Sequence, residues 1–487
     1  MLRFTVFENG APARSLSLDG AHLLGADHVP VRSEIRLEKG ELVCDARSRG
    51  AAALALMWSV EGVGRILLET PRVLDRPEPY HLHVELARGQ LMRISQKRED
   101  WGFYDHPQGK SLYDEIDKAR DLLVEALAAS DGATAAKFAD QSLTIGVKIG
   151  ESLSTYHADV NLPARKENGT MPALPLGCRI DPTHYTDAAM PCISEAFQFV
   201  ELPFTWASLQ PAEGKYETGH LEKALQHLKT HKMPIRGCSL LSFEPWETPD
   251  WLVKVAKDYD RLREAIMKHL RTVIRSFGGH VQSWEVCVGL HAYNPFKLSF
   301  EQLVELTRMS AILSRQSAPK SEVILGLVLP WGEYYANDPQ SIPPTLYAEM
   351  ALQSGVNFDA FSVQLQFGGQ HTAQYVRDLL QISSILDRIG SYGKPVHVSC
   401  AGVPSDGMTP MSGYWHDEWN EQVQSNWLRD IYRIALSKSF VESVSWQSWA
   451  DGVAPSPWGG LQKKDGSRKK SYQELLSLRS ELMGASA

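Results

Sequence analysis

The sequence predicts an α/β protein, namely a (β/α)8 TIM barrel preceded by a small antiparallel β domain and a helical hairpin. From about residue 175 onward, eight short β-rich runs alternate with helical stretches, which is typical of a closed parallel barrel. Before that point, apolar residues first follow a period of two and then a helical period. An open doubly wound sheet would need a glycine-rich phosphate turn after its first strand, and none stands there.

Residues 1–108 are predicted to form an N-terminal β-sandwich-like domain. Short apolar runs alternate with polar residues and are separated by Gly, Asp and Pro, which indicates antiparallel strands. The expected strand-bearing runs are LRFTVF, EIRLEKGELVCDA, ALALMWSV, GRILLET and YHLHVELARGQLMRISQ.

Residues 109–165 are predicted to form a helical hairpin and a linker. Two stretches place apolar residues at i, i+3, i+4 and i+7, namely SLYDEIDKARDLLVEALAAS and AAKFADQSLTIGVKIGESLSTYH. The apolar stripe around Ile116 and Leu123 is wide enough to need a partner surface, so we expect the N-terminal region to pack against the barrel. The polar, proline-bearing stretch NLPARKENGTMPALP is expected to be a linker.

Residues 166–487 are predicted to form the barrel. Its expected strands are PLGCRI, FQFVEL, PIRGCSLL, SWEVCV, EVILGLVL, FDAFSVQLQ, PVHVSC and VESVSWQSW. Functional residues of such barrels lie at the carboxyl ends of the strands, so the site is sought there.

Composition narrows the function classes. The chain has 487 residues and a net charge of −8, which disfavours a nucleic-acid partner or an anionic membrane. The first residues lack the pattern of a signal peptide, and no apolar run has the length of a membrane helix. Six scattered cysteines without a CxxC pair indicate reduced thiols, so we expect a cytoplasmic protein without metal or cofactor. Homo-oligomerisation is left open.

Tryptophan, glutamine and acidic residues gather at the predicted strand ends. Aromatic rings stack on the apolar faces of sugars, while amides and carboxylates bind hydroxyl groups, so this combination favours a carbohydrate cleft. A single tryptophan at such a position is as often a core residue as a ligand contact. The residues predicted to bind substrate are Glu201, Trp206, Trp331, Gln364, Gln366, Trp446 and Trp449.

Residues 175–480 resemble family 10 glycoside hydrolases, the (β/α)8 endo-β-1,4-xylanases. The resemblance lies in Glu201 and Trp206 with QPAEGKYE, in RGCSLL and PDWL, in the strand opening SWEV, in FDAFSVQLQ and in RIALSKSFVESVSWQSWADG. The N-terminal domain has no counterpart in the xylanase catalytic core. The two-part form is similar to proteins of environmental bacteria such as planctomycetes.

The resemblance does not extend to the acid pair. Retaining hydrolysis uses two carboxyl groups about 5 Å apart, which in the family end strand four and lie on strand seven. Here those positions hold Gly289 and Cys400, which we expect to face each other at the barrel mouth. Surrounding sugar-binding and supporting positions differ as well, at Leu202, Thr205, Phe243, Val288 and Gln366. Of the family's sugar contacts, Glu201, Trp206, Gln364 and Trp446 remain.

Three functions stay open from the sequence. The first is a pseudoenzyme that binds an oligosaccharide or glycan without cleaving it. The second is an active glycoside hydrolase with relocated carboxylates, in which Glu333 acts together with Glu201 or Glu244. The third is a structural or assembly protein on a TIM-barrel scaffold.

Overall fold

The predicted barrel is present and closed. The structure, a computed structural model, describes residues 1–46, 50–103, 110–183, 187–338, 340–369, 373–407, 411–453 and 456–483. The barrel strands are all parallel and follow the order β13-β12-β11-β20-β18-β17-β16-β15-β14, and a further pairing of β13 with β15 closes the ring. The third strand is interrupted, so that β13 and β14 together occupy one place in the barrel.

The barrel strands coincide with the β-rich runs of the sequence. Their bounds are β11 (Leu176–Arg179), β12 (Phe199–Pro203), β13 (Ile235–Cys238), β14 (Leu241–Ser242), β15 (Ser283–Val288), β16 (Glu322–Leu327), β17 (Ala360–Gln366), β18 (Val396–Gly402) and β20 (Val441–Trp446).

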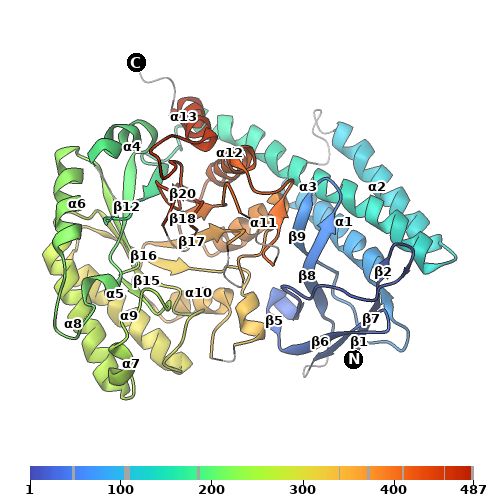
Figure 1. The fold of residues 1–487 in the computed structure, drawn as a ribbon, viewed down its shortest axis with the longest axis horizontal. Coiled ribbons are helices and arrows are strands. Elements are labelled where there is room, and N and C mark those ends of the chain that lie inside the picture. Colours follow the sequence, from blue (N-terminus) through green and yellow to red (C-terminus); the bar gives the residue numbers. More distant parts are fainter. Residues whose placement is uncertain are drawn as a thin grey trace.

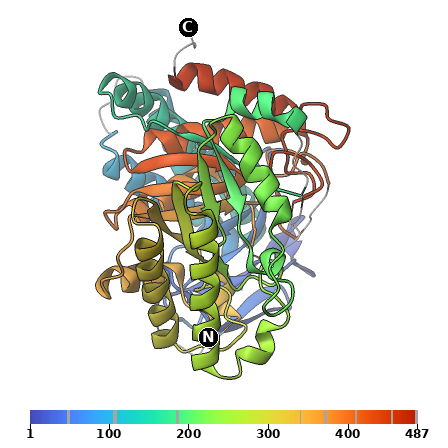
Figure 2. The same ribbon diagram turned by 90° about the vertical axis from the view of Figure 1, so that its left-hand side faces the viewer.

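Helices surround this ring, and Figure 2, seen from the barrel side, shows the green and yellow-green ones in front of the strands. They are η3 (Asp187–Ala189), α4 (Met190–Ala196), α5 (Trp206–Leu209), α6 (Gly219–Thr230), α7 (Leu252–Val255), α8 (Tyr259–Phe277), α9 (Phe300–Ser317), η4 (Glu333–Ala336), α10 (Pro344–Gln353), α11 (Leu379–Gly390), α12 (Glu421–Ser437) and α13 (Lys470–Met483).

The N-terminal region contains antiparallel sheets, as expected, with one parallel pairing between β1 and β10, and it also contains a long helix. One sheet has the order β10-β1-β7-β6, a second has the order β19-β9-β8-β4-β5, and β2 pairs with β3. Their bounds are β1 (Leu2–Thr5), β2 (Phe7–Glu8), β3 (Ala11–Pro12), β4 (His22–Leu24), β5 (Pro30–Val31), β6 (Ser33–Glu38), β7 (Glu41–Ala46), β8 (Ala53–Val60), β9 (Gly64–Glu69) and β10 (Tyr80–His81), with η1 (Ala26–His28) between β4 and β5.

The strand predicted for YHLHVELARGQLMRISQ is wrong beyond its first two residues. Tyr80 and His81 form β10, and α1 (Leu82–Asp100) follows immediately. Every residue of this helix from Leu82 to Ala87 is buried, and so is Ile94. A helix that is buried on several sides loses its 3.6-residue pattern, and the remaining short alternation imitates a strand.

The expected linker also differs, because its first half is helical. α2 (Lys110–Ala128) is followed by α3 (Gly132–Glu167), which continues through Pro163 for 36 residues. Arg165 fixes the end of α3 on the barrel by donating hydrogen bonds to the carbonyl groups of Leu436, Lys438, Ser439 and Val441. These contacts, together with the buried Leu162, offset the cost of a proline inside a helix.

The N-terminal region packs against the barrel, as expected. In Figure 1 the helices α1, α2 and α3 lie beside the N-terminal strands, and α3 reaches across to α12 of the barrel. The short strand β19 (Tyr414–Trp415), which follows β18 in the chain, pairs with β9 and so joins the N-terminal sheet. The backbone N–H of Leu67 donates to the carbonyl of Val376, which adds a second link.

Candidate functional site

A cavity of about 640 Å³ lies at the carboxyl ends of the barrel strands. The loops after β14, β15, β16 and β17 line it, and residues 18–22 of the N-terminal region cover one side. We call it the mouth cavity. Its aromatic lining consists of Trp246, Tyr293, Tyr334 and Tyr375. Its polar lining consists of Asp19, His22, Glu333, Asn337 and Asp338.

Glu244 stands beside this cavity, directly before Pro245 and Trp246 of the lining. Burial and the nearby charge of Glu247 raise the pKa of Glu244 to about 8, although a hydrogen bond with Tyr293 opposes the shift. Burial also raises the pKa of Glu247, which is almost fully covered. A carboxyl group with a pKa near 8 keeps its proton at neutral pH and can donate it.

Glu201 lies inside the barrel rather than at the mouth cavity. Its carboxylate accepts hydrogen bonds from Arg236, with N–O 3.2 Å, and from Ser445, with O–O 2.8 Å. Burial and the charge of Glu285 raise the pKa of Glu201, while Arg236 and Arg179 lower it. Glu201 is therefore part of a buried ionic network between β12, β13 and β20.

The predicted tryptophans are mostly core residues. Trp206, Trp446 and Trp449 are buried, and each indole N–H is bonded within the protein, to Gln210 (2.8 Å), to the carbonyl of Gly459 (2.8 Å) and to Gln462 (3.0 Å) respectively. One face of Trp206 stacks on the ring of His269, with centroids 4.4 Å apart. These indoles therefore offer little surface for stacking on a ligand.

The remaining predicted residues are divided between separate places. Gln364 and Gln366 are half-buried on β17, and Gln366 donates a hydrogen bond of 3.0 Å to Gln447. Trp331 does not line the mouth cavity but a second one, where it lies against the guanidinium of Arg377 at 4.7 Å. Glu333 lines the mouth cavity and is buried. The structure thus brings Glu333 to the mouth, with Glu244 beside it, and leaves Glu201 inside the barrel.

Gly289 and Cys400 both lie toward the carboxyl ends of barrel strands, Gly289 just after β15 and Cys400 within β18. Gly289 has a φ of +66°, and a Cβ atom there would lie 2.9 Å from a methyl group of Val328. Val328 belongs to a small apolar cluster with Val288 and Ala292. Burial raises the pKa of the Cys400 thiol to about 12, so this thiol stays protonated at neutral pH.

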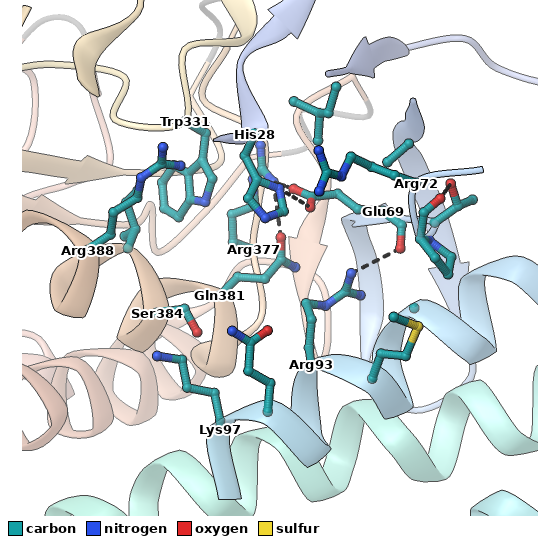
Figure 3. A pocket seen from close by; sticks show the side chains of 18 of the residues that line it. His28, Glu69, Arg72, Arg93, Lys97, Trp331, Arg377, Gln381, Ser384 and Arg388 are labelled. Atoms are coloured by element: carbon teal, nitrogen blue, oxygen red, sulfur yellow. Dashed lines mark hydrogen bonds and ion pairs between the residues drawn. The ribbon is translucent and has the colours of Figure 1, made fainter. Parts of the chain in front are cut away.

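A second cavity, of about 880 Å³, lies where the N-terminal sheet, α1 and the barrel loops meet. We call it the junction cavity, and Figure 3 shows its interior. Arg377 lines it and donates hydrogen bonds to Glu69 (3.3 Å), to Gln381 (3.0 Å) and to Glu333 (2.5 Å). Arg377 lines the junction cavity and Glu333 lines the mouth cavity, so their ion pair lies in the wall that separates the two cavities. His22 borders both cavities as well.

Sequence reasoning missed the junction cavity altogether. Its charged residues come from β9 and the loop after it, from α1 and α2, and from α11 and the segment that leads into it, and no local motif joins them. Within the part of the chain that the structure describes, no group of three His, Cys, Asp or Glu side chains is arranged to hold a metal ion. Among the same residues no helix is both long and apolar enough to cross a membrane.

Comparison with known proteins adds a family likeness. Residues 181–295 match the model of glycosyl hydrolase family 10, and this segment runs from the end of β11 to the loop after β15. Xylanase 10C from Cellvibrio japonicus has 12% sequence identity and a TM-score of 0.51, with 65% of this chain and 72% of that chain covered.

Two other solved structures are similar in extent. The family 10 protein from Paenibacillus barcinonensis has 16% identity and a TM-score of 0.49, covering 65% of this chain and 97% of that one. Xylanase 10B from Thermotoga maritima has 16% identity and a TM-score of 0.48, with 64% of this chain and 97% of that chain covered. At such identities the likeness establishes the fold alone, which is the (β/α)8 barrel.

Proposed function

Because residues 181–295 match glycosyl hydrolase family 10 and the barrel has that family's fold, we propose that this protein binds an oligosaccharide at the barrel mouth without cleaving it. The observation that carries the proposal is the mouth cavity itself. It is lined by the loops that follow β14, β15, β16 and β17, at the end of the barrel where proteins of this fold bind their ligands. Its volume of about 640 Å³ falls within the usual range of small-molecule sites.

The lining of the mouth cavity suits a sugar. Trp246 is 45% exposed, and Tyr293 and Tyr375 are half-buried, so all three rings offer surface for stacking on a pyranose. Asn337 and Asp338 lie on the same wall and can bind hydroxyl groups. We propose that these residues make the sugar contacts, while Glu201, Trp206, Trp446 and Trp449 hold the barrel together.

The absence of cleavage rests on the two positions that the resemblance assigns to the acid pair. Position 289 is a glycine whose backbone conformation and close neighbour disfavour any side chain. Position 400 is a buried thiol with a pKa of about 12, which is a poor nucleophile at neutral pH. The six free cysteines support a cytoplasmic location, which we propose as well, and a short oligosaccharide is the form of sugar that fits it.

A glycan array followed by calorimetry tests the binding site. Wild type is expected to bind a set of oligosaccharides, and Trp246→Ala should weaken that binding by about tenfold, because one stacking surface is lost. Trp458→Ala is the matched control, since Trp458 is also exposed, at 38%, but does not line the mouth cavity. Equal binding by wild type and Trp246→Ala would contradict the assigned site.

Hydrolysis with a relocated acid is the second candidate, and Glu244 is the observation that favours it. A glycosidase acid must carry a proton, and the pKa of Glu244 is raised to about 8 by burial and by Glu247. If wild type cleaves any oligosaccharide, Glu244→Gln should abolish turnover and retain binding. Activity should then fall as the pH rises past about 8, where Glu244 loses its proton. Turnover by Glu244→Gln would exclude this role.

A structural or assembly role is the third candidate. This role is supported only if a broad panel of oligosaccharides shows neither binding nor cleavage. In that case the binding proposal and the hydrolysis proposal both fail.

A further inference from the structure

We propose that the junction cavity binds a phosphorylated small molecule. This site is separate from the proposed sugar site and would stand if no oligosaccharide bound at the mouth. The cavity measures about 880 Å³, and seven Arg or Lys side chains line it against two Glu side chains.

Four of the seven cations are already neutralised by a carboxylate. Arg88 pairs with Glu85 at 2.6 Å, Lys97 with Asp387 at 2.9 Å, Arg120 with Asp117 at 3.0 Å and Arg377 with Glu333 at 2.5 Å.

The other three arginines have no carboxylate at ion-pair distance among the described residues. They are Arg72 after β9, Arg93 on α1 and Arg388 on α11. Three separate elements of the fold thus bring positive charge to one cavity. Arg93 and Arg388 are half-buried and Arg72 is exposed, so all three guanidinium groups can be reached from the cavity. Like charges gathered on one cavity wall repel one another, and an anionic ligand would offset that repulsion.

Neutral acceptors hold two of these arginines in place. Arg93 donates to the carbonyl of Glu69 (3.0 Å) and to the side chain of Gln90 (2.8 Å), while its Nε is buried and has no partner among the described residues. Arg388 donates to the carbonyl of Asp27 at 2.6 Å. Hydrogen bonds to carbonyl and amide oxygens orient a guanidinium without adding a negative charge beside it, so both groups are held in position for an anion.

The glutamate nearest to this charge is already engaged. In Figure 3, Arg93, Arg377 and His28 surround Glu69. Burial by itself would raise the pKa of Glu69, but these cations outweigh it and the pKa lies below the usual value. Glu69 is therefore a fixed anion whose charge Arg93 and Arg377 share, although Arg93 is not within ion-pair distance of it. Arg72 and Arg388 are two further lining arginines whose charge no described carboxylate offsets at ion-pair distance.

Phosphate fits this lining better than a single carboxylate. A guanidinium group can donate two parallel hydrogen bonds to two oxygens of one phosphate, and a phosphate dianion can pair with several arginines at once. The cavity is far larger than one phosphate group, and its wall also contains Trp331, Leu24, Met92 and Pro344. An apolar wall of this kind accommodates the organic part of a phosphate ester.

Calorimetry of the full-length protein tests the proposal with four probes, namely glucose 6-phosphate, AMP, glucose and citrate. The two phosphate esters should bind, with affinity that falls as salt is added, and glucose should not. Which ester binds more tightly distinguishes a sugar phosphate from a nucleotide. Binding of citrate with neither ester would overturn the choice of phosphate, and binding of no anion would overturn the site.

Variants locate the binding. Arg93→Gln and Arg388→Gln should each lower the affinity for the more tightly bound ester by about tenfold, because each removes a charge-assisted hydrogen bond. Arg275→Gln on α8 is the matched control, since Arg275 is an exposed arginine far from the cavity lining. Arg388→Gln alters a partly exposed side chain and should fold normally, which far-UV circular dichroism checks. Unchanged affinity in both pocket variants would refute the proposal, and Trp246→Ala should leave ester binding intact.

Discussion

At the scale of single residues, Gly289 supports the proposal that this barrel does not cleave its ligand. Its φ of +66° is a conformation that residues with a side chain rarely adopt, and Val328 fills the space where a Cβ would lie. A carboxylate introduced there would be displaced from the geometry that catalysis needs. The neighbouring residues Val288 and Ala292 are apolar and cannot orient it.

The double variant Gly289→Glu with Cys400→Glu should therefore show no xylanase activity, and Gly289→Ala alone should lose about 1–2 kcal/mol of unfolding free energy. Urea unfolding measures the loss, and release of reducing sugar measures activity. Gly279→Ala is the control, because no atom lies within 4 Å of a Cβ at that position. Robust turnover by the double variant would show that the surroundings of the acid pair matter less than we argue.

Glu333 was a candidate acid from its sequence context, but it forms a buried ion pair with Arg377. Arg377→Met leaves the carboxylates of Glu333 and Glu69 without their guanidinium partner, and it should cost about 3 kcal/mol or more of unfolding free energy. Urea unfolding of Arg377→Met beside the surface variant Arg275→Gln measures this cost. Glu333→Gln should retain oligosaccharide binding, whereas an acid at Glu333 would make that variant inactive in turnover with binding unchanged. An Arg377→Met protein as stable as wild type would contradict the importance of the pair.

At the scale of elements, α3 and β19 join the N-terminal region to the barrel. Glu151 on α3 accepts hydrogen bonds from Trp415 (2.7 Å) and from His416 (2.7 Å), both in the segment after β18. Burial alone would lower the pKa of His416, but the hydrogen bond and charge of Glu151 outweigh it and raise the pKa above 6.5. Asp430 adds to this shift and Lys148 opposes it.

The sign of the pH dependence follows from that raised pKa. Stabilisation by the His416–Glu151 pair is complete below pH 6.5, the usual histidine pKa, and disappears as the pH rises through the folded-state value. His416 is partly exposed, so the effect should not exceed about 1 kcal/mol. Urea unfolding of wild type and His416→Gln at pH 5.5 and 8.5 should show a larger difference at the lower pH. A difference that is equal at both, or larger at pH 8.5, would contradict this role.

At the scale of the whole molecule, the N-terminal region and the barrel should unfold together. β9 and β19 share a sheet, Arg165 binds four carbonyl groups of the barrel, and both cavities have walls from both regions. Thermal unfolding followed by circular dichroism and by tryptophan fluorescence should give one coincident transition. Limited proteolysis that releases a stable barrel beginning near residue 165 would contradict this expectation.

The sequence predicts the barrel well because each barrel strand is a short apolar run between turns, and this pattern is local. It predicts α1 poorly because burial on several sides removes the helical period between Leu82 and Ile94. It cannot distinguish the buried Trp206 and Trp446 from the exposed Trp246, since exposure depends on what packs over each ring. The arginines of the junction cavity are missed for the same reason, because only the folded chain brings Arg72, Arg93 and Arg388 together.

The central claim is that the barrel mouth binds an oligosaccharide and leaves it intact. Mass spectrometry of the best glycan-array ligand, recovered after prolonged incubation with excess wild-type protein, tests this most directly. We expect the ligand to be retained by the protein and recovered at its original mass. Recovery of shorter products that are absent after incubation with Glu244→Gln would contradict the claim and identify the protein as a hydrolase.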